Sequence, residues 1–247
     1  MFHIVVFATT GFWMYAIFDC IRNDPDRNVW IWLLLFFNYL GAVIYFATRM
    51  LPRMNTSSAP SYFKRWTKGR ELRAAEAAVV NIGKSHQYVQ LGNVLLEMSK
   101  VTQAEEAFQE AISKEPNHLD ALWGLASVAT SAKRWEEAQA YLQQILSLDS
   151  EYKRGDASLL LGKVLVSSEQ RELAKPHLIQ DIKAWSHPEA ALILATLQAE
   201  DGEKQDAYDI LKAMLSKLKA CPEFYYRQHR HIANKADRML QSLEKEL

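Results

Sequence analysis

The sequence predicts an all-α protein: a two-helix transmembrane hairpin, then an α-solenoid of about four helix–turn–helix units, then a C-terminal capping helix. Three observations support this fold class. Two apolar runs of about 20 residues, the length that crosses a bilayer, occupy the first fifty positions. Landmark residues then recur about every 34 positions, which is typical of stacked helix pairs. A last amphipathic stretch follows a proline and suits a helix that covers the exposed end of a solenoid.

Charge and composition vary along the chain. The 29 basic and 29 acidic residues cancel, which argues against a general binder of polyanions. Residues 1–73 nevertheless hold nine basic and four acidic side chains, so this part is positive and the remainder negative. Cys20 and Cys221 lie in different predicted parts and imply no disulfide framework. We expect a transmembrane hairpin at 1–49, a basic and aromatic linker at 50–70, the solenoid at 71–221 and the capping helix at 222–247.

The two apolar runs are the predicted hairpin. Phe2–Ile21 is apolar almost up to Asp19, and Val29–Thr48 contains no charge. At about 1.5 Å per residue each helix would span about 30 Å, the thickness of the hydrocarbon layer. The polar segment Arg22–Asn28 is so short that the helices must be antiparallel. The alternatives are a signal peptide, which the missing basic start and cleavage site oppose, and a first segment that lies on the membrane.

Basic residues after the second run predict the orientation. They are Arg49, Arg53, Lys64, Arg65, Lys68, Arg70 and Arg73. The positive-inside rule therefore places both termini and the repeats in the cytoplasm, and the expected location is a plasma membrane of the bacterial type. Inside the hairpin, Asn38 is expected to form an interhelical hydrogen bond at the level of Thr10, with Gly11 and Gly41 allowing close approach. The alternative for this polar level is an ion or lipid site.

The second run also carries a family resemblance. Trp30 and Trp32, then Leu40-Gly41-Ala42 and Tyr45, resemble the N-terminal membrane segment of cardiolipin synthases and other phospholipase D relatives. That family usually has a proline near Asn38. The resemblance implies membrane anchoring and no catalysis, because the family's pattern of His, Lys and Asp occurs nowhere in this chain.

Aromatic and basic side chains alternate in the linker that follows. They could stack on nucleic-acid bases or lie among anionic lipid headgroups. The nearby apolar runs favour lipid, and no nucleic-acid partner is expected. The candidate lipid-interface residues are Arg49, Arg53, Tyr62, Phe63, Lys64, Arg65, Trp66 and Lys68. From Glu71 to Ile82 the chain favours a helix, which Gly83 would end and which we expect to cap the first repeat.

Small and bulky residues recur in the repeats. Leu91-Gly92 is followed by Leu125-Ala126, Leu161-Gly162 and Leu194-Ala195, at steps of 34, 36 and 33 residues. In the same steps Ala104 recurs as Ala138, Ala174 and Ala207, and Phe108 as Leu142, Leu178 and Leu211. Small residues let two helices approach, and the bulky ones fill the space beside them. The best-formed unit is Ser85–Pro116, whose second helix ends at the proline.

These positions resemble the tetratricopeptide repeat family. The first unit matches through Tyr88, Leu91, Gly92, Leu95, Ala104, Phe108, Ala111 and Pro116, and the second through Leu122, Trp123, Leu125, Ala126, Trp135, Ala138, Leu142 and Ile145. The third and fourth units are degenerate, with Asp181 where the family prefers a small apolar residue. The alternative is an unrelated helical bundle whose periodicity arises by chance.

The resemblance implies that the first helix of each unit lines a concave, partner-binding face. The candidate groove residues are His86, Val89, Asn93, Asp120, Trp123, Ser127, Leu159, Lys163 and Leu192, with Glu97, Asp156, Glu189 and Thr196 beside them. A carboxylate clamp for peptide C-termini is disfavoured, because Asn93 and Lys163 are not on neighbouring units. We expect a partner helix or extended peptide along the apolar stripe of the groove. The alternative is that these residues fill space inside the protein, under the C-terminal helix.

Candidate chemistry is sparse. His229 and His231 are two residues apart, which on a helix separates them by about 200°, and no Cys or carboxylate accompanies them at metal-ligand spacing. The sequence contains no phosphate-binding loop, nucleophile elbow or paired acidic motif. We therefore expect no enzyme activity, cofactor or metal. The leading hypothesis is a membrane-anchored scaffold, such as a subunit or assembly factor of a membrane complex. The alternative is an accessory protein that recognises anionic lipid through its hairpin and basic linker.

Overall fold

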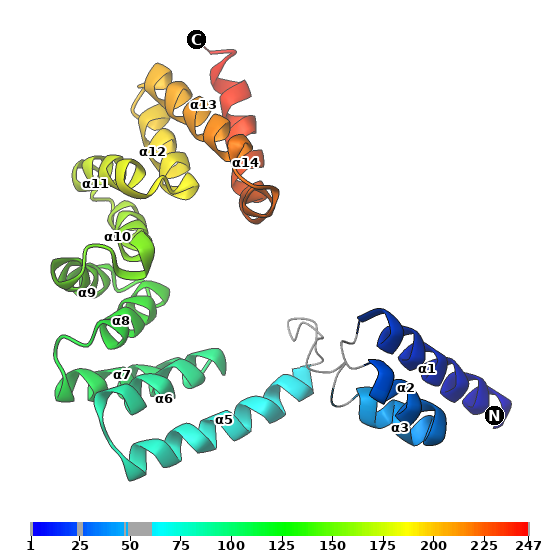
Figure 1. Cartoon of the computed structure of the whole chain (residues 1–247). Helices are drawn as coiled ribbons and strands as arrows, with labels where there is room; N and C mark the ends of the chain where they lie inside the picture. The colour runs from blue at the N-terminus through cyan, green and yellow to red at the C-terminus, as the bar shows by residue number, and fades with distance from the viewer. Residues whose placement is uncertain (1, 24–26, 47, 49–60, 247) are drawn as a thin grey trace. The chain divides into compact units, whose positions relative to one another are not determined.

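The structure is a computed structural model that describes residues 2–23, 27–46, 48 and 61–246. The chain separates into two compact units, Met1–Gly69 and Arg70–Leu247 (Figure 1). Every element in the described residues is helical, and the second unit carries the predicted solenoid. Each unit has its own buried core, so each is described by itself.

The first unit packs three helices together: α1 (Phe2–Asn23), α2 (Arg27–Phe36) and α3 (Asn38–Tyr45). Its small core comprises Ala16, Cys20, Leu34, Ala42 and Tyr45. Two hydrogen bonds join the helices. The indole Nε1 of Trp13 donates to the carbonyl of Leu34 at 2.9 Å, and the hydroxyl of Tyr45 donates to the carboxylate of Asp19 at 3.0 Å.

The second apolar run is not the single span-length helix that its hydropathy predicts. The run breaks at Asn38, whose φ of 46° is left-handed, a conformation that asparagine tolerates better than most residues. The rings of Trp30 and Tyr45 then lie 5.4 Å apart, whereas one straight helix would separate these residues by about 22 Å. Gly41 permits the fold-back, because a Cβ there would lie 2.6 Å from the carbonyl oxygen of Leu33.

The predicted interhelical contact of Asn38 at the level of Thr10 is therefore also wrong. Asn38 is exposed in the turn between α2 and α3 and does not lie in the middle of a helix facing Thr10. Gly11 does not lie at a close helix contact, since a Cβ there would meet nothing within 4 Å. Gly41 does allow close packing, but between α2 and α3. Among the residues described, we find no helix whose length and apolar character would let it cross a membrane.

The helix α5 (Ser61–Asn81) begins well before the alanine-rich stretch at Glu71. It ends before Gly83, whose φ of 65° suits a residue that terminates a helix. Leu72 of α5 packs against the core of the first repeat. This contact agrees with the expected capping role.

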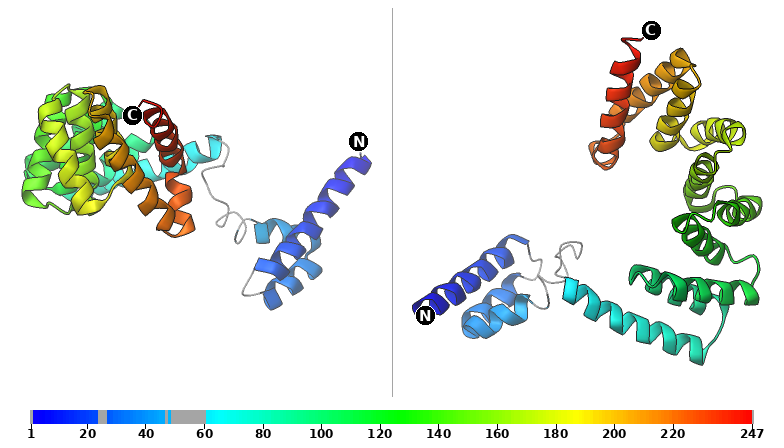
Figure 2. Two further views of the ribbon diagram at one scale, coloured as in Figure 1. Left: turned by 90° about the horizontal axis from the view of Figure 1, so that it is seen from above. Right: turned by 180° about the vertical axis from the view of Figure 1, so that it is seen from behind.

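Four helix pairs follow in the predicted order (Figure 2). They are α6 (Ser85–Glu97) with α7 (Val101–Lys114), α8 (Leu119–Ser131) with α9 (Trp135–Leu148), α10 (Asp156–Ser167) with α11 (Arg171–Trp185), and α12 (Pro188–Glu200) with α13 (Lys204–Ala220). The second helix of each pair packs on the first helix of the next. The predicted solenoid of four units is confirmed.

Small residues sit where the helices approach, as predicted. Ala104, Ala138, Ala174 and Ala207 are all fully buried. The ring of Phe108 is enclosed between two glycines: a Cβ on Gly92 of α6 would lie 2.6 Å from it, and one on Gly124 of α8 would lie 2.5 Å from it. The ring therefore joins the first two units. A residue larger than glycine at position 92 or 124 would force the ring or a helix to shift.

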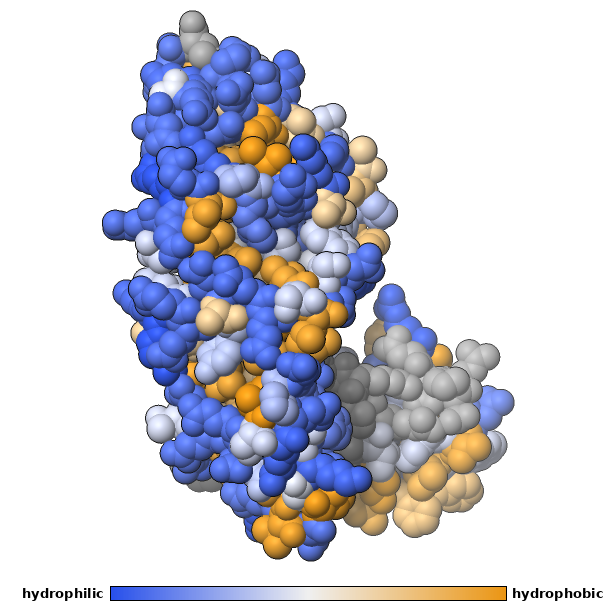
Figure 3. All heavy atoms as spheres, turned by 90° about the vertical axis from the view of Figure 1, so that its left-hand side faces the viewer, coloured by the Kyte–Doolittle hydropathy of each residue, from blue (hydrophilic) through white to orange (hydrophobic). Residues whose placement is uncertain are grey.

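The last helix, α14 (Glu223–Leu243), covers the exposed end of the solenoid. Its buried residues Ile232, Ala236 and Leu243 share a core with Leu192 of α12 and Leu211 of α13. In Figure 3 hydrophilic side chains dominate the visible face of the solenoid, whereas apolar side chains gather on the first unit. The two units therefore present different kinds of surface.

Candidate partner-binding groove

A groove of about 550 Å³ opens on the concave side of the solenoid. Its walls come from the first helices of the second, third and fourth units, and α14 closes one end. The lining residues are Trp123, Ser127, Thr130, Ser131, Asp156, Leu159, Leu160, Lys163, His187, Pro188, Glu189 and His229. We call this site the concave groove.

An inserted turn accounts for the position of the groove. The step from Leu125 to Leu161 is 36 residues, and the 3-10 turn Tyr152–Gly155 lies within it. Gly155 has a φ of 88°, and a Cβ there would lie 2.5 Å from the indole of Trp185. The turn packs on α10 and α11. As a result α8 and α10 approach each other less closely than α6 and α8 or α10 and α12, and the concave face is open there.

Trp123 is held at one side of the groove by the inserted turn. Its ring lies 6.1 Å from that of Tyr152, and the ammonium of Lys153 lies 5.8 Å from the centre of the Trp123 ring. The hydroxyl of Tyr152 donates to Asp120 at 2.6 Å, and Lys153 approaches the same oxygen at 3.4 Å. Asp120 therefore helps to fix this side of the groove.

The charges at this side follow from those contacts. The hydrogen bond from Tyr152 lowers the pKa of Asp120, and Lys153 lowers it further against the opposing effect of burial. Burial raises the pKa of Tyr152, and the neighbouring carboxylate adds to that rise. At neutral pH the carboxylate is charged and the phenol is neutral, so the hydrogen bond persists.

Hydroxyl groups of α8 form one wall of the groove. Ser127 donates to the carbonyl of Trp123 at 2.8 Å, Thr130 to that of Ala126 at 2.7 Å and Ser131 to that of Ser127 at 2.9 Å. Each hydroxyl has one proton and two lone pairs. With their protons directed at the helix, these groups present hydrogen-bond acceptors to the groove.

The opposite wall is joined by an ion pair between neighbouring units. Lys163 of α10 lies 2.8 Å from the carboxylate of Glu189 on α12. Both side chains are partly exposed, so this pair between α10 and α12 adds little to stability and gives this wall charged groups of both signs.

Histidines occupy the closed end of the groove. His187 Nδ1 lies 2.7 Å from Oδ1 of Asp181, a residue that is 1% exposed. Burial lowers the pKa of His229, nearby His231 lowers it further, and Glu189 opposes the change. These effects favour the neutral ring of His229, and its ring centroid lies 4.4 Å from that of Tyr225.

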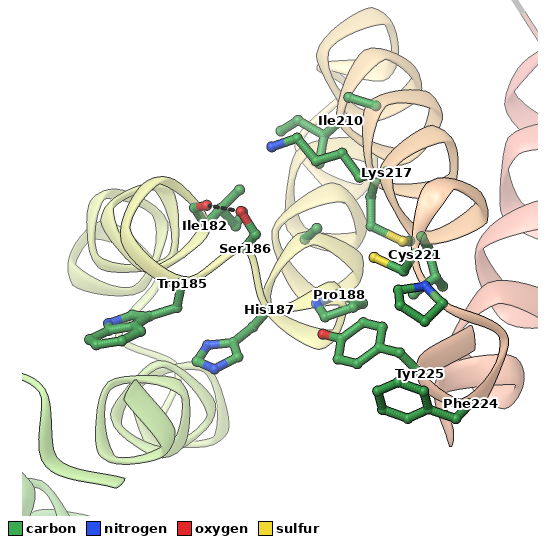
Figure 4. A pocket seen from close by; sticks show the side chains of 15 residues that line it. Ile182, Trp185, Ser186, His187, Pro188, Ile210, Lys217, Cys221, Phe224 and Tyr225 are labelled. Carbon is green, nitrogen blue, oxygen red and sulfur yellow. Dashed lines mark hydrogen bonds between the residues drawn. The ribbon is translucent and has the colours of Figure 1, made fainter. Parts of the chain in front are cut away.

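A second, apolar pocket of about 320 Å³ lies on the other side of His187 and Pro188 (Figure 4). The aromatic rings of Tyr225 and Phe224 stand at its mouth, and Ile210, Met214 and Ile182 form its apolar lining. Periodicity did not predict this pocket. The signal available was Phe224, an apolar residue two positions after the helix-breaking Pro222; its side chain is 72% exposed.

The structure gathers part of the predicted site. Trp123, Ser127, Leu159 and Lys163 line one groove, together with Asp156 and Glu189. His86, Asn93 and Glu97 are exposed on α6, away from that groove. Val89 and Leu192 were expected to be exposed and are buried, at 3% and 6%. Val89 belongs to the core of the first unit, and α14 covers Leu192 and places Met239 beside Thr196.

Only some of the candidate lipid-interface residues belong to the part of the chain that the structure describes. Arg49 and Arg53 fall outside the described residues, while Tyr62, Phe63, Lys64, Arg65 and Trp66 belong to the first turns of α5 and Lys68 is half-buried there. Within the described ranges, no group of three or more His, Cys, Asp or Glu is arranged to hold a metal ion.

Comparisons with known proteins agree with this architecture. A model of the tetratricopeptide repeat family matches residues 89–153, and a model of the phospholipase D-nuclease N-terminal family matches residues 11–49. No curated protein matches the chain.

Several solved structures resemble the chain. YrrB, described as a TPR protein with an unusual peptide-binding site, aligns with a TM-score of 0.54 at 20% identity, over 70% of this chain and 94% of that one. MamA aligns with a TM-score of 0.58 at 20% identity, over 64% and 94%. Pseudomonas aeruginosa PilF aligns with a TM-score of 0.53 at 17% identity, over 75% and 93%. The fold is therefore a solenoid of tetratricopeptide-repeat type.

Proposed function

We propose that this protein is a membrane-attached adaptor whose concave groove binds a segment of a protein partner. The observation that carries the proposal is the open groove between α8 and α10, where Trp123 and Leu159 remain accessible beside ordered polar walls. Trp123 is large and is held in place by Tyr152 and Lys153. It is therefore the kind of aromatic anchor that dominates protein interfaces.

The lining of the groove defines the chemistry of the partner. Trp123 and Leu159 suit an apolar side chain, and the hydroxyls of α8 suit the N–H donors of an extended peptide or polar side chains on a helix. The description of the similarly folded YrrB as peptide-binding supports this class of partner. A scaffold role is also consistent with the absence of a catalytic motif from the sequence.

Membrane attachment through residues 1–49 is the second part of the proposal. The match of residues 11–49 to the phospholipase D-nuclease N-terminal family supports it. Large apolar side chains are exposed on all three helices of the first unit, among them Phe18, Trp32 and Val43. An adaptor with this arrangement would serve as a subunit or assembly factor of a membrane complex, and the positive-inside bias favours a cytoplasmic solenoid.

Site-specific photocrosslinking in living cells tests the groove. A photoreactive phenylalanine analogue replaces Ser131, which is exposed at the groove, or Leu148, which is 45% exposed and does not line it. We expect a discrete adduct from position 131 and none from position 148. Equal adducts at both positions, or none at position 131, would contradict groove binding.

Two further variants separate binding from folding. Trp123→Ala in the position-131 background should abolish the adduct while the circular dichroism spectrum is retained. Lys163→Glu should weaken the adduct, and adding Glu189→Lys should restore the ion pair with its sign reversed. Restoration of the ion pair without restoration of the adduct would identify Lys163 itself as a contact to the partner.

The alternative is a lipid-associated accessory protein, favoured by the nine basic residues within 1–73. It predicts that a chain starting at Ser61 binds vesicles containing anionic phosphatidylglycerol and that a chain starting at Ser85 does not. Weak binding by both chains, alongside a groove adduct, would favour the adaptor.

A further inference from the structure

The turn between α2 and α3 is apolar and exposed, which is the reverse of an ordinary surface turn. Phe36, Phe37 and Leu40 are 78%, 56% and 62% exposed. Turns of water-soluble proteins are dominated by Gly, Pro, Asn, Asp and Ser, and Asn38 is the one such residue here. Trp32 stacks on Phe36 with ring centroids 6.0 Å apart, which extends the apolar surface along α2.

The hairpin formed by α2 and α3 is too short to cross a bilayer. The contact between Trp30 and Tyr45 fixes their antiparallel arrangement. The 10 residues of α2 are about 15 Å long, half of the hydrocarbon thickness of about 30 Å. A hairpin of this length reaches the middle of the lipid at most and then returns.

The two ends of the hairpin differ in polarity. At the end opposite the turn, Tyr45 is hydrogen-bonded to Asp19, and Asn28 and Thr48 are exposed. Seven of the nine basic residues of the first part of the sequence follow within 49–73, where they complement anionic headgroups. The apolar end therefore suits lipid chains, and the polar end suits the interface.

Backbone pairing at the turn reduces the penalty of placing it in lipid, where unpaired amides are strongly disfavoured. The amide of Phe37 donates to Leu33 at 3.0 Å. The amides of Leu40 and Gly41 both donate to the carbonyl of Phe37, at 3.0 and 3.2 Å. The helical hydrogen bonds thus continue to within a residue or two of the break at Asn38.

We propose that α2 and α3 form a re-entrant hairpin, which enters the lipid with its Phe36–Leu40 turn and leaves on the side from which it entered. This inference rests on the membrane attachment proposed above and specifies its form. It places Asn28 and Thr48 on the same side of the bilayer as the solenoid, whereas one spanning helix would place them on opposite sides.

Cysteine labelling of the full chain tests the sidedness. In a Cys20→Ala, Cys221→Ala background, single cysteines replace Asn28, Thr48 or, as a solenoid reference, the exposed Lys133. A membrane-impermeant maleimide is applied to sealed vesicles of known orientation. We expect all three positions to react from the same face. Reaction of Asn28→Cys and Thr48→Cys from opposite faces would overturn the re-entrant hairpin.

Depth-dependent quenching tests insertion of the turn. The purified full chain, labelled with a fluorophore at Leu40→Cys or Asn28→Cys, is reconstituted into phosphatidylethanolamine–phosphatidylglycerol vesicles. Nitroxide groups on the lipid acyl chains should quench position 40 at least about twofold more than position 28, because only the turn reaches the hydrocarbon layer. Equal quenching would overturn the proposal, because the turn would then lie no deeper in the lipid than Asn28.

Extraction with alkaline carbonate distinguishes the two levels of failure. A wild-type chain that does not sediment with cell membranes before the extraction would refute membrane attachment itself, and release by carbonate would refute insertion into the lipid. Retention combined with opposite-face labelling of Asn28→Cys and Thr48→Cys would leave attachment intact and refute only the re-entrant form.

Discussion

At the scale of single residues, the carboxylate of Asp181 stands out because it is buried in a position where a small apolar residue would pack. Its Oδ1 is paired with His187 Nδ1 at 2.7 Å, and its Oδ2 has no hydrogen-bond partner among the described residues. A buried charge held by one partner becomes strongly unfavourable when that partner is removed.

His187→Ala should therefore destabilise the solenoid by about 3 kcal/mol, because it leaves the carboxylate of Asp181 uncompensated. Asp181→Ala should be less damaging, since the lost group is itself difficult to bury. The double variant should recover much of the stability lost in His187→Ala. Urea unfolding followed by tryptophan fluorescence measures all three, and additive effects of the two substitutions would contradict direct coupling.

The pKa of His229 provides a second residue-level prediction. Burial and the neighbouring His231 lower this pKa, so the unfolded chain binds a proton more readily than the folded one. Stability from this group is therefore complete above the unfolded pKa of about 6.5 and falls as the pH drops through the folded pKa.

NMR titration of the His229 ring should give a pKa below that of a free histidine. Glu189→Gln should lower it further, because Glu189 favours the imidazolium. Glu97→Gln, an exposed carboxylate on α6, is the matched control and should leave the value unchanged. A pKa at or above 6.5 in the wild type would contradict the prediction, because burial would then not outweigh the attraction of Glu189 for the imidazolium.

At the scale of elements, the first two units are joined by the ring of Phe108 between Gly92 and Gly124. Gly124→Ala should destabilise the solenoid by about 1–3 kcal/mol, because the ring is enclosed on both sides and cannot move away. Adding Phe108→Leu, the residue found at the equivalent position of the other units, should recover part of the loss.

Gly69→Ala is the control for that substitution. A Cβ at Gly69 would meet nothing within 4 Å, and alanine favours a helix over glycine by about 1 kcal/mol. Thermal unfolding of the variants measures the difference. Equal melting temperatures for Gly124→Ala and Gly69→Ala would exclude close packing around Phe108.

Periodicity predicted elements that rest on recurring residues and missed those that do not. Gly92, Ala104 and Phe108 recur in kind, so their packing roles were accessible. Gly124 does not, because Gln90 and Leu160 occupy the equivalent positions of the adjacent units. The longer step before Leu161 corresponds to the inserted turn, which was not predicted from the sequence, and nothing in Lys153 and Arg154 signals their positive φ angles.

The break at Asn38 was missed for another physical reason. Val29–Thr48 is apolar on every face, so a straight helix and two short helices have the same hydropathy. The observations that decide between them are contacts, such as Trp30 with Tyr45 and Gly41 with the backbone of Leu33. Such contacts depend on the tertiary fold.

At the scale of the molecule, the concave face is only partly available for binding. The sequence predicted Trp123, Leu159 and Lys163 as groove residues because local spacing places them on the first helices of their units. Leu192 has the same kind of place but is buried, because α14 folds back onto α12 from a distant part of the sequence. The helix α14 thus covers the concave face of the fourth unit, and the open groove is confined to the middle of the solenoid.

The separate cores of the two units lead to a prediction for the whole chain. The first unit has a core around Leu34 and Tyr45, and the second has clusters that run from Val89 to Leu243. A chain of residues 70–247 should therefore fold and unfold cooperatively without residues 1–69 and remain in the supernatant after ultracentrifugation. It should still form the groove adduct from position 131, because every lining residue lies in this unit. The full chain should sediment with membranes. Loss of the adduct from a folded 70–247 chain would mean that partner binding requires the first unit, and the groove alone would no longer account for recognition.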